Sequence, residues 1–226
     1  MIRSVLFDTE TTGLDPMAGD RVIEVAALEL VNDLPTGRHF HALVHPQRPI
    51  PEEVTRIHGI TLDQLEGKPL FAEIADELLE FLGDGKLVAH NAPFDFAFLD
   101  AEFSRLGLPP LDGGRMIDTL ALAKARFPGL PNSLDALCRR FGIDLTERTM
   151  HNALLDCKLL AEVYVELTGG RQGGLSLADA RQDSMPVASY AAVGTRTPRR
   201  IVPTEAESSA HATFLKKIKT PIWTAG

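Results

Sequence analysis

The sequence predicts an α/β domain, with a mixed sheet and helices on both of its faces, followed by a C-terminal tail. Two observations predict the domain: strand-like apolar segments come first, and strands then alternate with segments of helical periodicity. A third observation separates the tail. Residues 170–226 carry eight Lys/Arg and four Asp/Glu, a net charge of +4, whereas the preceding 169 residues carry a net charge of −12. Such a change along one chain is typical of two parts with different roles.

The predicted sheet begins with three consecutive strands. Residues 5–7 form a buried β-type run, and residues 22–31 and 40–45 follow it as further strands of a meander. The link at 32–37 contains Asp, Pro and Gly, which favour turns. A short apolar run at 86–89 predicts one more buried strand.

The predicted helices have recognisable starts and ends. Residues 71–82 show apolar spacing of helical period. The next helix has Pro93 just inside its start and Gly107 as its stop. Ser133 is an N-cap residue for a further helix, and residues 153–167 form a longer helix that two glycines end. Helices therefore separate the later strands, as a mixed sheet requires.

Composition places the chain among ordinary globular proteins. It has 226 residues, of which 44% are apolar and 24% charged, enough for one core and a tail. No apolar run approaches the ~20 residues of a membrane span, and the first strand begins too early to leave room for a signal peptide. Cys138 and Cys157 lie in apolar helical contexts and are expected to be reduced. These features predict a cytoplasmic protein without membrane contact.

Two acids follow the first apolar run. Asp8 and Glu10 are two residues apart, so on an extended chain their side chains point to the same face. Two carboxylates that close repel each other, and one becomes neutral unless a cation lies between them. Carboxylate oxygens suit Mg²⁺ or Mn²⁺. The pair therefore predicts a metal site, against the alternative of a strand end with solvated acids.

Further acids and a histidine occur near the starts of two later helices. Asp95 lies in the first turn of the helix after the strand at 86–89, at the carboxyl edge of the sheet where α/β sites collect. Asp156 lies in the helix at 153–167, and five residues of helix would turn His151 about 140° away from it. We therefore expect His151 in the preceding loop, where a general base for water could act. Taken singly, each residue also fits an ordinary helix start.

Together, three separated segments resemble the DEDD superfamily of 3′→5′ exonucleases, in its histidine-containing subtype. FDTETTGL (7–14) resembles the first exonuclease motif, HNAPFDFAFLD (90–100) the second and HNALLDCKLLAEVY (151–164) the third. The resemblance covers residues 1 to about 168. It implies an RNase H-like fold with a mixed five-stranded sheet, and hydrolysis of phosphodiester bonds at DNA 3′ ends that releases nucleoside 5′-monophosphates.

The same resemblance implies a role for each candidate catalytic residue. Two divalent ions, Mg²⁺ or Mn²⁺, would be held by four carboxylates. Asp8 would bridge both ions, Glu10 and Asp156 would hold the first, and Asp95 would orient the second. His151 would remove the proton from the attacking water.

A further set of residues is expected to contact the terminal nucleotide: Thr11, Gly13, Leu14, Glu53, His58 and Phe94. Thr11 and Gly13 offer a hydroxyl and a permissive backbone, and Leu14 would form an apolar wedge beside the base. Glu53 and His58 match family positions that contact the nucleotide, although a helix-capping acid and a core histidine explain them equally well. Phe94 either stacks on a base or packs in the core, and packing is favoured.

The resemblance is closer to one branch, the proofreading subunits of bacterial replicative DNA polymerases. NSLDALC (132–138), LTGG (167–170) and the long tail carry it. This branch implies a replisome protein at the nucleoid that binds the polymerase subunit. A small accessory subunit that binds the exonuclease domain is left open.

Three segments follow from this division: an exonuclease domain at 1–169, a flexible linker at 170–203 and a polymerase-binding tail at 204–226. The tail would bind through four apolar residues, Phe214, Leu215, Ile222 and Trp223. In the linker, Gln172, Leu175 and Leu177 have the Gln-x-x-Leu-x-apolar spacing of sliding-clamp peptides, with leucine where phenylalanine is more usual. An ordinary linker with two leucines is the alternative.

Two other functions compete with proofreading. The first is a free-standing 3′→5′ exoribonuclease of the same fold, since no residue pattern reports on a 2′-OH. The second is a non-catalytic polymerase adaptor, which the loss of a catalytic acid would have favoured; all four are present.

Overall fold

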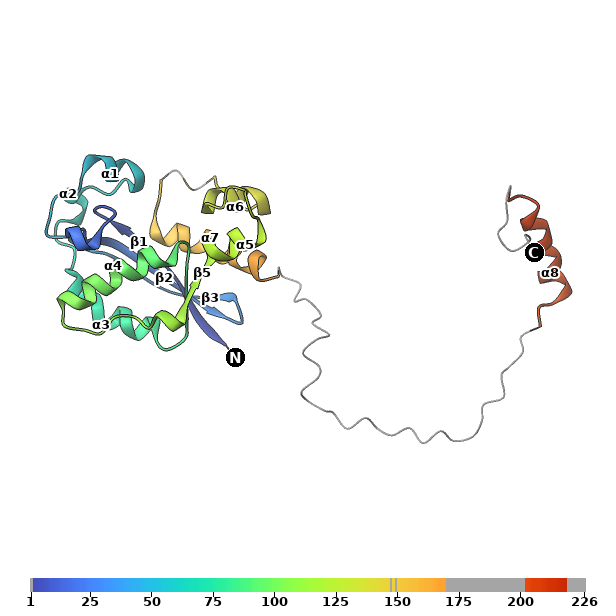
Figure 1. Cartoon of the computed structure of the whole chain (residues 1–226), viewed down its shortest axis with the longest axis horizontal. Helices are drawn as coiled ribbons and strands as arrows, with labels where there is room; N and C mark the ends of the chain where they lie inside the picture. The colour runs from blue at the N-terminus through green and yellow to red at the C-terminus, as the bar shows by residue number, and fades with distance from the viewer. Residues whose placement is uncertain (1, 147, 149, 170–201, 219–226) are drawn as a thin grey trace, which may run out of the picture. The chain divides into compact units, whose positions relative to one another are not determined.

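The computed structural model describes residues 2–146, 148, 150–169 and 202–218, which belong to two separate compact units (Figure 1). The larger unit is built on a five-stranded mixed sheet with the order β3-β2-β1-β4-β5. Its strands are β1 (Arg3–Thr11), β2 (Val22–Val31), β3 (Leu34–Leu43), β4 (Lys86–Ala89) and β5 (Met116–Asp118). The first three pair antiparallel, and β1, β4 and β5 pair parallel. The predicted mixed five-stranded sheet is confirmed.

Helices cover both faces of the sheet, as predicted. They are α1 (Glu52–His58), α2 (Leu62–Leu65), α3 (Phe71–Leu82), α4 (Ala92–Arg105), α5 (Thr119–Arg126), α6 (Leu134–Phe141) and α7 (Ala153–Thr168), with short 3-10 turns at Pro16–Ala18 and Gly113–Arg115. In Figure 1, α3 and α4 lie on one face, and α7 lies on the other with α5 and α6.

Alternation along β1 supplies both cores. Phe7 packs against Phe96 of α4 with ring centroids 5.7 Å apart, and Leu6 shares the other buried cluster with Leu160 of α7. Successive side chains of a strand point to opposite faces, so one central strand anchors both helical layers. Because β1 is buried between two neighbours, the residues at its carboxyl end are held rigidly.

Local periodicity predicted several elements closely. β2, α3 and β4 have the predicted bounds, and α4 and α7 differ by a residue or so at an end. Ser133 caps α6 by accepting a hydrogen bond from the Ala136 N–H at 3.3 Å. Cys138 and Cys157 are both free and buried, as expected.

The predicted position of the third strand is wrong. β3 starts well before 40–45, and the predicted link at 32–37 shrinks to a two-residue turn. Asn32 and Asp33 form that turn with positive φ angles of 51° and 64°. Pro35 therefore lies inside a strand, which is tolerated because β3 is the edge of the sheet.

Four elements have no counterpart among the predicted segments: α1, α2, α5 and β5. The strand has three residues, α2 has four, and α1 buries only His58. Such short elements carry too little periodicity to stand out in a sequence. In the part of the chain that the structure describes, no helix is long and apolar enough to cross a membrane.

The second unit contains α8 (Glu205–Leu215). Its start is fixed by a capping box, in which the Thr204 N–H donates to Glu207 Oε2 at 2.8 Å and the Glu207 N–H donates to Thr204 Oγ1 at 3.3 Å. Phe214 on this helix is 58% exposed. Leu215 ends the helix, whereas Ile222, Trp223 and the clamp-type residues at 172–177 lie outside the described residues.

Candidate active site

The predicted acids and the histidine meet at the carboxyl end of β1. Asp8 and Glu10 lie on the face of β1 that α7 covers, and Asp156 lies in the first turn of α7. One ligand atom each from Glu10, His151 and Asp156 lies within 4.8 Å of the other two. Asp8 lines a cavity of about 520 Å³ together with His151 and Asp156. Folding therefore gathers residues that are separated by about 140 positions in the sequence.

Burial, and after it the crowding of these carboxylates, opposes their ionisation. Burial raises the pKa of Glu10 to about 8, and the charges of Asp156 and Glu24 add to this effect. Burial, followed by the charges of Asp95 and Glu10, also raises the pKa of Asp8 well above its usual range. Acids that would otherwise stay protonated become ionised when a cation binds among them.

Asp95 reaches the centre from α4, on the opposite face of β1. Its Oδ1 accepts hydrogen bonds from the Thr9 N–H at 3.1 Å and from the Thr9 hydroxyl at 2.8 Å. Burial nevertheless raises the pKa of Asp95 to about 7. Thr9, which lies between Asp8 and Glu10, therefore fixes the fourth acid to the strand that carries the first two.

Asp156 differs from the other acids because an arginine neutralises it. Arg148 Nε and Nη2 donate to the two carboxylate oxygens of Asp156 at 2.6 and 2.8 Å. Burial opposes ionisation of Asp156, but the hydrogen bonds from Arg148 outweigh it and lower the pKa of this carboxyl.

A fifth acid, Glu24, holds the start of α7 in place. This fully buried residue of β2 lies opposite Glu10 in the strand register. It accepts hydrogen bonds from Asn152 Nδ2 at 2.9 Å and from the Ala153 N–H at 3.1 Å. Because Asn152 follows His151 directly, Glu24 also limits where the histidine can lie.

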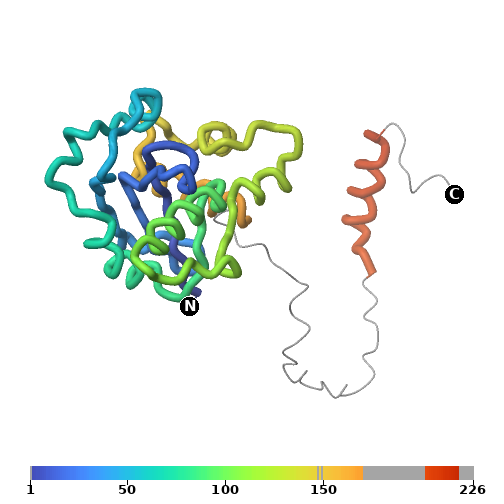
Figure 2. The backbone as a smooth tube through the Cα atoms, turned by 60° about the vertical axis from the view of Figure 1, so that its left-hand side comes forward, coloured from blue at the N-terminus to red at the C-terminus, as the bar shows by residue number. Residues whose placement is uncertain are grey.

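His151 lies in the loop before α7, and its side chain is 50% exposed. The loop is docked on α1, since the His151 N–H donates to the Ile57 carbonyl at 3.2 Å. Figures 1 and 2 show α1 and the segment that enters α7 side by side at one end of the sheet. A short helix that sequence analysis missed thus supports the candidate base.

His58 faces the same region with an unused donor. Its Nδ1 accepts a hydrogen bond from the Ile60 N–H at 3.0 Å, so its proton lies on Nε2. Nε2 is buried and has no hydrogen-bond partner among the described residues. The ring lies close to the Thr11 backbone, and burial lowers the pKa of His58. An unsatisfied buried donor is uncommon in a core histidine, and the nucleotide contact of His58 stays a prediction.

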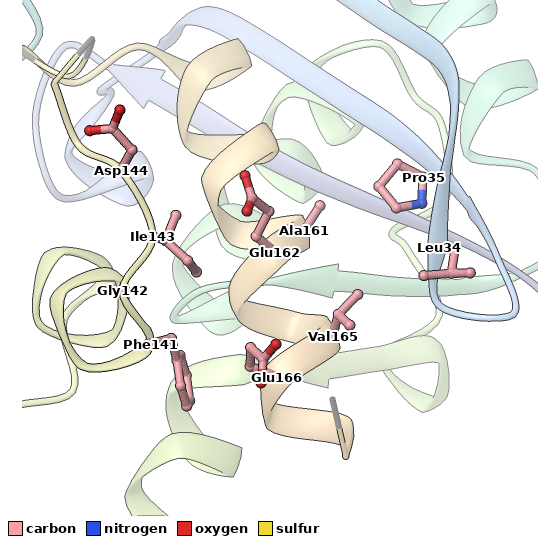
Figure 3. A pocket seen from close by; sticks show the side chains of 10 residues that line it. All are labelled: Leu34, Pro35, Phe141, Gly142, Ile143, Asp144, Ala161, Glu162, Val165 and Glu166. Carbon is pink, nitrogen blue, oxygen red and sulfur yellow. The ribbon is translucent and has the colours of Figure 1, made fainter. Parts of the chain in front are cut away.

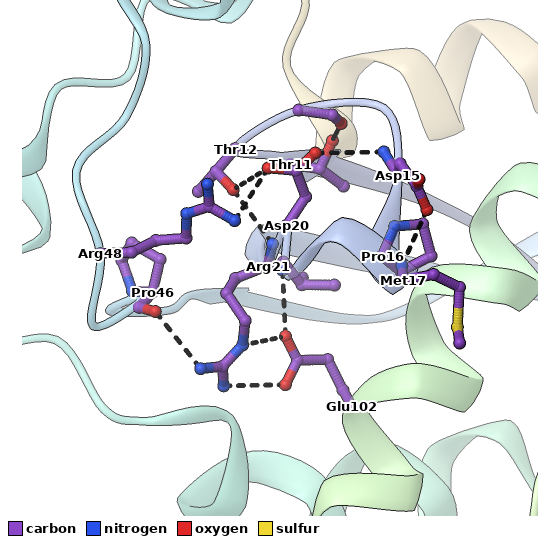
Figure 4. Close-up of polar contacts among 12 residues, drawn as sticks. Thr11, Thr12, Asp15, Pro16, Met17, Asp20, Arg21, Pro46, Arg48 and Glu102 are labelled. Carbon is purple, nitrogen blue, oxygen red and sulfur yellow. Dashed lines mark hydrogen bonds and ion pairs between the residues drawn. The ribbon is translucent and has the colours of Figure 1, made fainter.

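The turn after β1, expected to line the nucleotide, is held by Asp20 (Figure 4). Asp20 Oδ2 accepts from the Asp15 N–H at 3.1 Å, and Oδ1 accepts from the Thr12 hydroxyl at 3.2 Å and pairs with Arg48 at 2.9 Å. The Thr11 hydroxyl donates to the Gly13 carbonyl at 2.6 Å. The turn is therefore a rigid, hydrogen-bonded structure.

Arg21 joins this turn to the helix that carries Asp95. Its Nε and Nη2 donate to the two oxygens of Glu102 on α4 at 2.7 and 2.9 Å (Figure 4). Glu102 is 1% exposed and also accepts from the Val22 N–H at 3.2 Å. A buried bidentate pair of this kind fixes geometry more than it adds stability.

Gly13 is required by the position of Asp20 rather than by its backbone angles. A Cβ atom at Gly13 would collide with the Asp20 carboxylate. We predict that Gly13→Ala displaces the turn and raises KM for an oligonucleotide about tenfold, with a smaller change in kcat. Steady-state kinetics measures this split. Gly113→Ala is the matched control, since nothing lies within 4 Å of its added Cβ; equal KM values for the two variants would contradict the prediction.

The other expected nucleotide contacts are placed as follows. Leu14 is 82% exposed beside the turn, as an apolar wedge would be. Glu53 is exposed on α1. Phe94 packs against Phe98 with ring centroids 4.8 Å apart and adjoins the core, which agrees with the favoured packing role.

A second cavity of about 520 Å³ lies away from the proposed catalytic acids, on the outer side of α7 (Figure 3). The loop Phe141–Asp144, the start of β3 and Glu162 and Glu166 of α7 line it. It contains none of the predicted catalytic residues.

The residues at the acidic centre fit a divalent cation. They offer carboxylate oxygens and one imidazole at ligand spacing, and burial raises the pKa values of three carboxyls, Asp8, Glu10 and Asp95. Three supporting residues were missed by sequence analysis: Thr9, Glu24 and Arg148. Their contacts span up to 129 positions, and no spacing rule connects them with the acids.

The chain matches the protein family described as Exonuclease over residues 5–164. It is 46% identical over 223 residues to DNA polymerase III subunit epsilon of Rickettsia felis, a match that covers 96% of this chain and 97% of that protein. It is 45% identical over 176 residues to the Escherichia coli protein of the same name, which covers 75% of this chain and 72% of that protein.

Solved structures share this fold. Exonuclease X in complex with 5′ overhanging duplex DNA superposes with a TM-score of 0.57 at 29% identity, covering 74% of this chain and 91% of that chain. A structure of exonuclease I superposes with a TM-score of 0.64 at 20% identity, covering 74% of this chain and 41% of that chain. At that identity the likeness concerns the fold alone.

Proposed function

We propose that the acidic centre described above is the active site of this chain. The chain belongs to the exonuclease family and is of the DNA polymerase III epsilon type. The chain is a 3′→5′ exonuclease of the proofreading type. The observation that carries the assignment of the site is the convergence of Glu10, His151 and Asp156 within 4.8 Å, beside Asp8.

Divalent metal ions are the cofactors that this family uses and that the site fits. We propose two ions, Mg²⁺ or Mn²⁺, held by Asp8, Glu10, Asp95 and Asp156. When bound, such ions stabilise the charge that develops on the attacked phosphate and on the leaving 3′ oxygen. The chain supplies fixed ligands: β1 carries two of them, Thr9 orients the third and α7 presents the fourth.

His151 is the proposed general base. Its exposed ring, on a loop that α1 supports, can take the proton of a water molecule that attacks the terminal phosphodiester. Thr11, Gly13, Leu14 and His58 are proposed to position the terminal nucleotide. The unused Nε2–H of His58 suits an oxygen of the nucleotide.

Selectivity for errors requires no reading of base edges. A mispaired 3′ end separates from the template at lower cost than a paired one, so it enters the site as a single strand more often. The test compares the rates at which nucleoside monophosphates are released from 3′-mispaired DNA, from paired DNA and from an RNA oligomer, each with Mg²⁺ or Mn²⁺. Faster release from the mispaired end supports the proposal, and release confined to RNA would overturn it.

The competing functions are not favoured. A free-standing exoribonuclease fits poorly with relatives that match over nearly the whole chain, tail included, and are named as polymerase subunits. A non-catalytic adaptor fits poorly with a complete set of acids and histidine.

For partners, we propose the alpha subunit of DNA polymerase III, bound through residues 204–226. The relatives are named as subunits of this polymerase. In the described part of the tail, the exposed Phe214 at the end of α8 offers an apolar anchor. We infer that the chain works at the replisome on the nucleoid, in the bacterial cytoplasm. Binding of a small accessory subunit stays a secondary proposal.

Truncation is predicted to separate catalysis from tethering. A chain that ends at Thr168 keeps all elements of the exonuclease unit, so its rate on single-stranded DNA should stay within about twofold. It should no longer co-purify with the polymerase alpha subunit. The full chain has a single tryptophan, Trp223, and its emission should shift to the blue when alpha is added. Unchanged affinity of the truncated chain for alpha would refute the tail as the tether.

A second truncation tests the proposed clamp contact. A chain that ends at Pro203 keeps Gln172, Leu175 and Leu177 but loses the polymerase-binding segment. It should bind the sliding clamp weakly, and Gln172→Ala should abolish this binding. Equal clamp binding by the two chains in a titration would reject the motif.

A further inference from the structure

Arg148 is the most completely paired side chain at the acidic centre. Its side chain is 8% exposed, and each of its three nitrogens has a partner. Nε and Nη2 bond to Asp156, Nη1 donates to Asp135 Oδ1 at 2.6 Å, and Nη2 lies 3.1 Å from His151 Nδ1. Arg148 thus joins two of the proposed catalytic residues to α6, through Asp135.

These contacts occupy the atoms that catalysis needs. Both carboxylate oxygens of Asp156 accept hydrogen bonds from the guanidinium, so a metal ion would have to compete with Arg148 for either oxygen. His151 Nδ1 lies 3.1 Å from Arg148 Nη2 and 3.4 Å from Asp156 Oδ2. Arginine can only donate, so the shorter contact requires Nδ1 to accept, which puts the proton of the neutral ring on Nε2.

We propose that Arg148 is a positioning residue that stands in for the metal ion: it holds Asp156 and His151 in place in the metal-free protein and competes with the metal for Asp156. This inference rests on the proposed metal site. A buried acid without a counter-cation is costly, and Arg148 removes that cost until a divalent ion arrives.

Release of Arg148 changes both catalytic residues together. The Asp156 oxygens become available as ligands. His151 Nδ1 no longer accepts from the guanidinium, so it can carry the proton and leave Nε2 free to act as a base. Asp135, which is 39% exposed, retains its ion pair with Arg148 Nη1, so the arginine stays next to the site. The resting contact therefore couples metal binding to the competent form of the base.

The test measures metal affinity rather than activity. In calorimetric titrations of the full chain with Mn²⁺, Arg148→Gln should bind about tenfold more tightly than the wild type, the factor expected for loss of one competing charge-assisted hydrogen bond. Arg148→Lys, which keeps the charge but not the bidentate geometry, should fall between the two. In EDTA, Arg148→Gln should lower Tm by about 5 °C, and saturating Mn²⁺ should restore it.

Arg139→Gln is the matched control. Arg139 also faces Asp135, at 3.9 Å, but its side chain is 74% exposed. This variant should bind Mn²⁺ like the wild type. In ¹⁵N–¹H spectra of the imidazole rings, the metal-free wild type should show His151 with its proton on Nε2, and Arg148→Gln should lose that preference. Unchanged or weaker Mn²⁺ binding by Arg148→Gln would overturn the proposal, and lack of Mn²⁺ binding by every chain would refute the metal site itself.

Discussion

Asp8→Ala is expected to abolish nucleotide release while leaving the exonuclease unit folded. Asp8 is proposed to hold the metal ions, so its loss would remove a ligand oxygen from the end of β1. Loss of a metal ligand affects every substrate equally. Release from single-stranded and mispaired DNA should therefore fall together, to the level of the blank reaction.

The same variant is expected to keep or increase the stability of the metal-free protein. Burial and neighbouring acids raise the pKa of Asp8, so ionising it in the folded state is unfavourable. Its neighbour Glu10, whose pKa burial raises to about 8, stays in place in this variant.

The stability of the metal-free protein has a defined pH dependence. Between the ordinary pKa of about 4.5 and the folded value of about 8, Glu10 binds more protons in the folded state than in the unfolded state. The free energy of unfolding of the metal-free protein should therefore fall as pH rises through this window. In Asp8→Ala this fall should be shallower.

Thermal unfolding in EDTA at several pH values, together with product release in Mg²⁺, measures both effects. Asp76→Ala is the control, because Asp76 is exposed on α3, away from the site. Retained nuclease activity in purified Asp8→Ala would contradict the two-metal assignment. A large loss of stability would show that Asp8 is structural.

His151→Gln is expected to lower the rate about 10²–10⁴-fold, the usual contribution of a general base. The loop is held by the backbone contact to Ile57, and the base lies outside the core, so the fold should not change. The acidic limb of the pH–rate profile should disappear, because the base acts only when it is unprotonated.

His151 lies close enough to Glu10 and Asp156 to be a metal ligand rather than a base, so one more measurement is needed. Calorimetric titration with Mn²⁺ separates a base from a ligand: His151→Gln should bind the metal as the wild type does. A tenfold weaker affinity would make His151 a ligand, and an unchanged acidic limb would assign the titration to another group. His39→Gln, on the exposed edge strand β3, is the control.

Local sequence patterns predict the central part of this fold and the residues proposed for the active site. The bounds of β2, α3 and β4 follow from local apolar periodicity, which each element carries within itself. The predicted fold class and exonuclease family are confirmed. Both could be predicted because three motifs with fixed residue types coincide within one chain. Metal and general-base roles for the four acids and His151 could be proposed because catalysis requires those residue types.

The residues that support that chemistry are found from contacts in the folded chain. The true start of β3 depends on pairing with β2, and the short α1 acquires its role by docking under the His151 loop. Glu24 and Glu102 make contacts with segments far away in the sequence, and Arg148 joins α6 to α7. An arginine or glutamate in a sequence does not show its partner, because hydrogen bonds and ion pairs depend on distance in space. The sequence therefore identified the reacting groups, and the fold determined how they are held, neutralised and released.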